Sequence, residues 1–351
     1  MISPVSIVVI GAGGISSSYF AAMAGNPNVQ LVGVVDNRPE AAMKAANPFG
    51  VRWFMNVAEL MASTIQFEAA IVCTPPNTHE EIATELAKRG VHVLCEKPIS
   101  ITSASARRMA AVAQKSGTIL TMGSKFRYVN DVIEARERVQ KHLIGDVVLF
   151  ENAFTGRVDM SRRWNSMPAV SGGGVLIDNG THSVDILRYF LGPLAEVHAV
   201  EGKRIQNLPV EDTARLFVRS QAGVMGSVDL SWSLNKELDW YVNVFGSEGV
   251  IQVGWKSSRM KIGNGDWEVF GQGYDKVQAF RSQVNNFARA IRKIEPLIIT
   301  WEDALASVYV IEAAYDSMRA SGWTNVKSSC PLTNTPSPIG ETAIHREVVR
   351  A

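Results

Sequence analysis

The chain has 351 residues, of which 46% are hydrophobic and 20% are charged, with 35 Lys and Arg against 34 Asp and Glu. This length exceeds what one hydrophobic core usually organises, so we expect two domains. The near-zero net charge, without a long block of one sign, argues against nucleic acid as a partner, because neutralising phosphates requires a concentrated basic face.

Membrane, metal and disulfide roles are not expected either. No apolar run approaches the roughly 20 residues that cross a bilayer. The first residues lead into an apolar strand without a basic region or a cleavage site, which predicts a cytoplasmic protein. Cys73, Cys95 and Cys330 have neither disulfide nor zinc spacing, so we expect reduced thiols.

Residues 5–123 alternate short apolar runs with helical patterns, as parallel strands joined by crossover helices do. The runs are nearly continuous in Val, Ile and Leu, which is typical of strands that are covered on both faces. We expect strands at 5–10, 29–36, 68–74, 91–96 and 119–122. A helix is predicted at 78–88, with Thr78 and Glu81 as a capping box. The first domain, 1–123, is therefore expected to be a doubly wound parallel α/β sheet.

After Gly123 the pattern changes to one helix, at about 129–142, and then to strands with period-2 alternation. Strand candidates are 146–154, 196–205, 213–219, 224–232, 240–245 and 250–255. We expect a large, mostly antiparallel open sheet with helices on one face. Two helices, at about 276–293 and 302–321, complete a second domain over 124–323. The polar tail, 324–351, is expected to be poorly ordered or to wrap around a neighbour.

A glycine loop follows the first strand, in the sequence Gly11-Ala12-Gly13-Gly14-Ile15-Ser16. It is close to the Gly-x-Gly-x-x-Gly/Ala pattern of dinucleotide-binding folds. The first Gly allows a tight turn, and the second lets backbone N–H groups approach a pyrophosphate at the positive end of the next helix. We expect Gly11, Gly13, Gly14 and Ile15 to bind a dinucleotide.

The second strand ends in Asp36, in the interval where a ribose-binding carboxylate belongs. Such a carboxylate accepts hydrogen bonds from the ribose hydroxyls of NAD and repels the 2′-phosphate of NADP. Arg38, two residues on, could instead cover that phosphate. We predict NAD as the cofactor, with NADP as the alternative, bound by Asp36, Asn37 and Arg38.

Polar segments also follow two later strands, at the carboxyl edge where ligands bind in open α/β sheets. Thr74, Pro75, Asn77 and His79 lie after one strand, and Glu96, Lys97 and Pro98 end the next. We expect Thr74, Pro75, Asn77, His79, Glu96 and Lys97 to line the dinucleotide. For Asn77 and for Thr78, capping of the next helix is the alternative.

A third segment runs from Gly172-Gly173-Gly174 to Asp178 and His182, which a helix would place on one face. Oxidation of an alcohol needs a base with a pKa near neutral at the hydroxyl, and His182 fits that role. Lys97 supplies a positive charge for the developing alkoxide. Asp178 can orient the substrate or hold His182 in the useful charge state. Lys97, Asp178 and His182 are thus the candidate catalytic residues.

Three motifs follow one another along the chain: the glycine loop, Glu96-Lys97-Pro98 and the segment from Gly172 to His182. In their order and spacing, the sequence resembles the glucose-fructose oxidoreductase and inositol dehydrogenase (Gfo/Idh/MocA) family over residues 5–321. The resemblance implies a Rossmann domain followed by a substrate-binding and oligomerisation α/β domain, 124–323, whose large open sheet makes homodimer or homotetramer contacts. It implies that Lys97, Asp178 and His182 surround the reacting carbinol and that the Lys97–Pro98 bond is cis. It also implies an NAD(P)-dependent dehydrogenase of a sugar, a sugar derivative or a cyclitol such as inositol.

Three further residues and two further functions remain open. Arg127 would face the nicotinamide or the substrate, or lie on the surface. Arg163 and Trp164 would grip a phosphate or stack on a sugar ring, or belong to a flexible charged loop. The alternative functions are a non-catalytic dinucleotide-binding sensor or assembly protein on the same fold, and an NAD-assisted glycosidase that uses the same residues.

Overall fold

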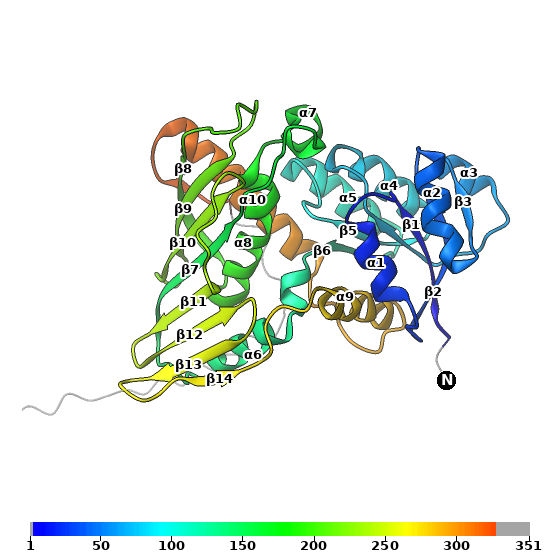
Figure 1. Cartoon of the computed structure of the whole chain (residues 1–351). Helices are drawn as coiled ribbons and strands as arrows, with labels where there is room; N and C mark the ends of the chain where they lie inside the picture. The colour runs from blue at the N-terminus through cyan, green and yellow to red at the C-terminus, as the bar shows by residue number, and fades with distance from the viewer. Residues whose placement is uncertain (1–2, 328–351) are drawn as a thin grey trace, which may run out of the picture.

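The structure is a computed structural model that describes residues 3–327, and it contains two sheets that lie side by side (Figure 1). The first sheet has the strand order β3-β2-β1-β4-β5-β6, and its strand pairs are parallel. Its strands are β1 (Val5–Ile10), β2 (Val29–Val35), β3 (Arg52–Phe54), β4 (Ala69–Val72), β5 (His92–Glu96) and β6 (Leu120–Gly123). The predicted N-terminal parallel sheet is confirmed. The sequence pattern does not predict β3, because its three residues form no apolar run.

Helices cover both faces of the first sheet. They are α1 (Ser16–Met23), α2 (Pro39–Ala46), α3 (Val57–Ala62), α4 (His79–Lys88), α5 (Ser103–Lys115) and α9 (Lys276–Ile291). On one face α4 and α5 contribute Leu86 and Met109 to the core. On the other face α1 packs against α9, where the rings of Tyr19 and Phe280 meet edge to face with centroids 4.8 Å apart. A helix from late in the chain therefore completes the first layer.

The second sheet has the order β14-β13-β12-β11-β7-β10-β9-β8-β15. Its strands are β7 (Val147–Thr155), β8 (Leu194–Glu201), β9 (Thr213–Ser220), β10 (Met225–Ser231), β11 (Trp240–Gly246), β12 (Gly249–Gly254), β13 (Ser258–Ile262), β14 (Glu268–Phe270) and β15 (Thr324–Asn325). The pair of β7 and β10 is parallel, and the other pairs are antiparallel. The predicted large, mostly antiparallel sheet is confirmed.

One face of this second sheet is covered by helices (Figure 1). Besides α9, the helices after β6 are α6 (Asn130–Gln140), α7 (Pro168–Ser171), α8 (Val175–Leu191) and α10 (Trp301–Ala320). Short 3₁₀ helices are η1 (Asn47–Phe49), η2 (Pro76–Thr78), η3 (Lys125–Tyr128) and η4 (Trp164–Ser166). Strand β9 shows the resulting alternation, because Leu216 and Val218 are buried while Phe217 between them is exposed. The opposite face of β8, β9 and β10 has no covering element among residues 3–327.

Helix α10 belongs to both cores. It begins with a capping box, in which the Thr300 side chain accepts from the Asp303 backbone and the Asp303 side chain accepts from the Thr300 backbone. Leu305 and Val308 pack with the first sheet, and Ile311 packs with the second. A helix that is apolar on most of its circumference is expected where two cores meet.

Two details differ from the sequence-based expectations. The capping box of Thr78 and Glu81 does not form: the Thr78 hydroxyl instead donates to the Thr74 hydroxyl at 2.7 Å and to the Pro75 carbonyl oxygen at 2.8 Å. The first residues of the predicted tail form β15, which extends the edge of the sheet beside β8. The tail from residue 328 on, including Cys330, lies outside the described residues. Between residues 3 and 327 no helix combines the length and apolarity that a membrane span requires.

Candidate active site

The glycine loop joins β1 to α1 with a geometry that excludes side chains at one position. Gly11 has φ +95°, and a Cβ there would lie 2.8 Å from the backbone carbonyl carbon of Cys73. By contrast, a Cβ at Gly13 or Gly14 would meet nothing within 4 Å, so both residues face open space. Their backbone is therefore accessible to a ligand at the start of α1, as pyrophosphate binding requires.

This open space is part of a cavity of about 540 Å³ along the carboxyl edge of the first sheet. Of the predicted cofactor residues, the cavity is lined by Gly11, Gly13, Gly14, Asp36, Asn37, Arg38, Thr74 and Pro75. Met55, Asn56 and Val57 also line it and were not predicted, because nothing near β3 indicates a strand. We call this space the dinucleotide cavity.

Asp36 is held in its ionised form at the end of β2. Its carboxylate accepts from the backbone N–H of Ala12 at 2.7 Å and from Nε of Arg38 at 3.0 Å. Burial acts to raise the pKa of Asp36, but the hydrogen bonds from Arg38 and Ala12 outweigh burial and lower it. The Arg38 side chain is largely exposed, so it can move away while the carboxylate stays fixed by Ala12.

Five predicted cofactor residues lie outside this cavity: Ile15, Glu96 and Lys97 line a second cavity, and Asn77 and His79 line neither. Asn77 is exposed and lines neither cavity described here. His79 is fully buried, with Nε2 2.8 Å from the carbonyl oxygen of Thr74 and Nδ1 3.1 Å from that of Pro98. His79 therefore fastens the end of β4 to the segment after β5, whose Lys97–Pro98 bond is cis as the resemblance implied.

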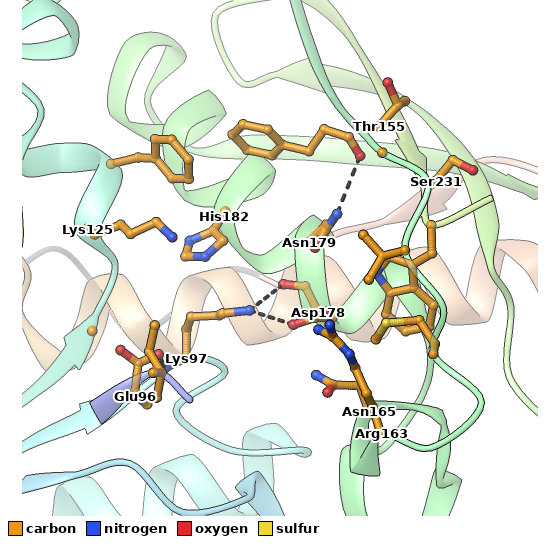
Figure 2. Close-up of a pocket in the computed structure, with 18 of the residues that line it drawn as sticks. Glu96, Lys97, Lys125, Thr155, Arg163, Asn165, Asp178, Asn179, His182 and Ser231 are labelled. Carbon is orange, nitrogen blue, oxygen red and sulfur yellow. Dashed lines mark hydrogen bonds and ion pairs between the residues drawn. The ribbon is translucent and has the colours of Figure 1, made fainter. Parts of the chain in front are cut away.

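A second cavity, of about 370 Å³, lies where the two sheets meet (Figure 2), and we call it the reaction cavity. Glu96, Lys97 and Ile15 reach it from the first sheet and the glycine loop. Asp178 and His182 reach it from α8, one turn apart as predicted. The structure thus brings Lys97, Asp178 and His182 to one space, beside the dinucleotide cavity at the glycine loop.

Lys97 and Asp178 form an ion pair in this cavity. Lys97 Nζ lies 2.6 Å from Asp178 Oδ1 and donates also to the Asp178 carbonyl oxygen at 3.2 Å. Behind them, buried Glu96 accepts from the Tyr19 hydroxyl at 2.7 Å and from the Lys97 backbone N–H at 3.1 Å. Burial raises the pKa of Glu96, and Tyr19 and Lys97 counteract only part of that rise. Glu96 therefore fixes the backbone of Lys97, and its carboxyl oxygens are already engaged by the Tyr19 hydroxyl and the Lys97 N–H.

His182 is buried against aromatic rings, with the Phe126 ring edge-on at a centroid distance of 5.1 Å. Burial, followed by the charges of Lys97 and Lys125, lowers the pKa of His182 well below its usual value. His182 Nδ1 has no hydrogen-bond partner among residues 3–327. The ring is thus neutral at physiological pH and can accept a proton.

The low pKa depends partly on Lys125, a residue that sequence reasoning missed. Lys125 begins η3 directly after β6 and lines the reaction cavity, with its side chain directed towards His182 (Figure 2). The only sequence signal was its position after the strand, and that signal was assigned to Arg127. Asn165, Asn179 and Trp255 line the same cavity and carry no motif.

The structure places Arg127 in the interior, away from the surface and outside both cavities. Arg127 is 5% exposed, and its Nη2 lies 2.7 Å from Asp185 and 3.4 Å from Asp303. It lines neither cavity and instead joins η3 to α8 and α10. The physical reason is that Asp185, which is fully buried on α8, needs a cationic partner.

Arg163 and Trp164, although adjacent in sequence, line different cavities. Arg163 lines the reaction cavity, and Trp164 lines the dinucleotide cavity beside Met55 and Asn56. Both side chains are exposed at the rim. The segment between β7 and α7 therefore spans the boundary between the two cavities.

Comparisons with known proteins agree with this architecture. Residues 5–124 match the model of an oxidoreductase family with an NAD-binding Rossmann fold, GFO/IDH/MocA, and residues 132–252 match the model of a GFO/IDH/MocA C-terminal domain. The inositol 2-dehydrogenase of Rhizobium meliloti is 24% identical over 88% of this chain and 96% of its own length. The structure of GenD2 from gentamicin A biosynthesis in complex with NAD is 27% identical, with a TM-score of 0.83 over 93% of this chain and 98% of that one. The structure of levoglucosan dehydrogenase with NADH and levoglucosan, 19% identical, has the same fold, with a TM-score of 0.87 over 93% of this chain and 100% of that one.

Proposed function

Because the chain belongs to the GFO/IDH/MocA family of oxidoreductases, we propose that it is an NAD-dependent dehydrogenase that transfers a hydride between the nicotinamide and a secondary alcohol or ketone carbon of a sugar, a sugar derivative or a cyclitol. One observation carries the proposal: a neutral, buried His182 and a Lys97–Asp178 ion pair face the same cavity, next to a glycine-loop cavity. The printed activities of the relatives, such as inositol 2-dehydrogenase and D-glucoside 3-dehydrogenase, support the substrate class.

The dinucleotide cavity fits NAD. Gly13 and Gly14 leave the space that a pyrophosphate needs, and the ionised Asp36 can accept from ribose hydroxyls. When bound, the nicotinamide accepts the hydride that leaves the carbinol carbon. The same carboxylate would repel the 2′-phosphate of NADP, which favours NAD, while exposed Arg38 keeps NADP as the alternative.

The reaction cavity supplies the proton transfer. A ring nitrogen of His182 takes the hydroxyl proton as the hydride departs, because its lowered pKa keeps it neutral and ready to accept. Lys97 stabilises the developing alkoxide with its ammonium. Asp178 accepts from Lys97 Nζ and so positions that ammonium. In reduction the same groups act in reverse, with protonated His182 returning the proton.

A substrate screen tests this function. Purified protein is incubated with NAD or NADP and a panel of inositols, aldoses, glycosides and sugar phosphates, and formation of reduced cofactor is followed at 340 nm. A dehydrogenase produces reduced cofactor and a ketone in equal amounts. Cofactor binding without turnover of any panel member would instead support the sensor, and glycoside cleavage without net reduced cofactor would support the glycosidase.

We also infer that the chain forms a homodimer or homotetramer through the open face of the second sheet. Val200, Phe217 and Met225 project from this face and are exposed. Isolated exposed apolar residues are common, but several on one flat sheet face are typical of a subunit interface. Cytoplasmic location stays a prediction.

A further inference from the structure

Lys125 is an ammonium without an acidic partner inside the reaction cavity. Its Nζ lies over the rings of Phe126 at 5.3 Å, Phe280 at 5.8 Å and Tyr274 at 5.9 Å from the centroids. The described residues offer it neither an ion pair nor a hydrogen bond. Cation–π contacts at such distances compensate only part of the cost of removing an ammonium from water.

The cavity contains more cations than free acids. Three basic side chains line it, Lys97, Lys125 and Arg163, and two acids line it, Glu96 and Asp178. Both acids are engaged already, Asp178 by Lys97 and Glu96 by the Tyr19 hydroxyl and the Lys97 backbone. Arg163 at the rim has no acidic partner within the described range either. The lining therefore has one more basic than acidic side chain, and neither Lys125 nor Arg163 is paired directly with one of its acids.

The cofactor does not explain the charge of Lys125. The glycine loop and Asp36, which suit the pyrophosphate and the ribose, line the dinucleotide cavity, whereas Lys125 lines the reaction cavity only. In Figure 2 the Lys125 side chain extends beside His182, while Arg163 lies on the far side of Asp178, next to Asn165. Lys125 is thus one of two cations beside the base, and unlike Lys97 it is not paired with Asp178.

We infer that the substrate of this dehydrogenase carries an anionic group, a carboxylate or a phosphate, and that Lys125 binds that group close to the reacting carbinol. The inference rests on the proposed function and narrows its substrate class from polyols in general to acidic polyols. An anion at Lys125 would pair with a partly buried ammonium that has no acidic partner among residues 3–327, through a charge-assisted hydrogen bond. A neutral inositol or aldose would leave that ammonium uncompensated.

The ionisation of Lys125 is consistent with this role. Burial, followed by the charge of Lys97, lowers the pKa of Lys125 to about 8. Among the other groups that face it, Glu96 and Asp178 act to raise this pKa, and Lys276 of α9 acts to lower it. His182 on α8 is neutral and adds no charge. Lys125 is therefore mostly protonated at pH 7 and loses its charge as the pH rises through about 8, which makes anion recognition pH-dependent.

The test compares matched ligands that differ in charge. Binding to the protein saturated with NADH is measured by isothermal titration calorimetry, and turnover with NAD is measured in parallel. The pairs are D-gluconate with D-glucitol, D-glucuronate with D-glucose, and D-glucose 6-phosphate with D-glucose. At pH 7 we expect at least one anionic member to bind about 10- to 100-fold more tightly than its neutral partner, the range expected for hydrogen bonds to charged groups. The first two pairs measure the preference for a carboxylate and the third measures the preference for a phosphate, so comparing them shows which anion Lys125 binds.

Three variants assign the preference to Lys125. Lys125→Met should remove it while NAD affinity stays unchanged, and Lys276→Met, which removes a nearby exposed charge outside the cavity, should retain it. Raising the pH to 9.5 should weaken the preference in the unaltered protein but not in Lys125→Arg, because a guanidinium stays protonated.

The outcomes separate this inference from the proposed function. Equal affinity within every pair, or a preference that survives Lys125→Met, would overturn the inference. Oxidation of neutral polyols without any charge preference would do so too and would leave the dehydrogenase function standing. Tight binding of an anionic polyol that depends on Lys125, without turnover of any ligand, would support the inference and count against the proposed function.

Discussion

Single residues decide when the proposed proton transfer operates. Because His182 has a pKa well below its usual value, its neutral form persists at pH 6.5, where an ordinary histidine would be half protonated. The rate of alcohol oxidation should therefore stay on its plateau through pH 6.5 and fall only at lower pH, as His182 becomes protonated. This differs from the ordinary histidine range that the sequence alone would suggest.

The matching substitution is His182→Ala. It should lower kcat about 10²- to 10⁴-fold, the usual contribution of a positioned base, and leave the Kd of NAD nearly unchanged. His142→Asn, at an exposed position in another part of the chain, is the control and should keep normal kcat. Normal turnover in His182→Ala would mean that the proton leaves by another route.

The cofactor choice rests on Asp36. Replacing Asp36 by Ser removes the carboxylate that would repel a 2′-phosphate, so the ratio of the Kd values for NADP and NAD should fall about tenfold or more, which corresponds to about 1.4 kcal/mol. Titrations with both dinucleotides measure this ratio. Arg38→Ser is the control and should keep NAD preferred. Preference for NADP in the unaltered protein would show that Arg38 dominates.

At the scale of elements, the Arg127 ion pairs stabilise the contact of η3 with α8 and α10. Arg127→Met leaves the fully buried Asp185 carboxylate with the Ser124 hydroxyl, at 2.6 Å, as its one hydrogen-bond donor within residues 3–327. We expect the free energy of unfolding to fall by about 3–5 kcal/mol, as when a buried pair loses one partner. Urea titration measures this loss. Arg89→Met breaks the exposed pair with Glu85 and should cost less than about 1 kcal/mol. If Arg127→Met lowers activity without lowering stability, the alternative that Arg127 contacts the substrate would be supported instead.

The hydrophobic periodicity of the sequence predicted where the helices and strands lie, but not which of them pack or pair with one another. The apolar runs located β1, β2, β4, β5 and β6 because strands buried on both faces are continuous in Val, Ile and Leu. The same patterns could not reveal that α9 packs on α1, or that β7 pairs in parallel with β10, because such contacts join residues far apart in the chain.

For the site, motifs located the groups whose spacing is local, such as Asp178 and His182 on one helix. They could not distinguish Lys125 from Arg127, two residues apart on η3, because only the packing of α8 shows which one meets Asp185. His79 was likewise assigned to the cofactor, although it lies buried between two strand ends, against the carbonyl oxygens of Thr74 and Pro98. The missing information in each case is tertiary.

At the scale of the whole molecule, the open sheet face makes a prediction about assembly. Light scattering at micromolar concentration should give the mass of a dimer or a tetramer. Phe217→Asp places a charge in the centre of this face and should shift the protein towards the monomer. Met43→Asp, at an exposed apolar position on α2, is the control and should leave the mass unchanged. A monomer in the unaltered protein would contradict the interface.

Helix α10 also has a consequence for how the molecule loses its structure. Since Leu305 and Val308 belong to one core and Ile311 to the other, detaching either layer strips apolar surface from a helix that the other layer still holds. Neither sheet can unfold without removing contacts from the other core, so a calorimetric scan should show a single cooperative transition.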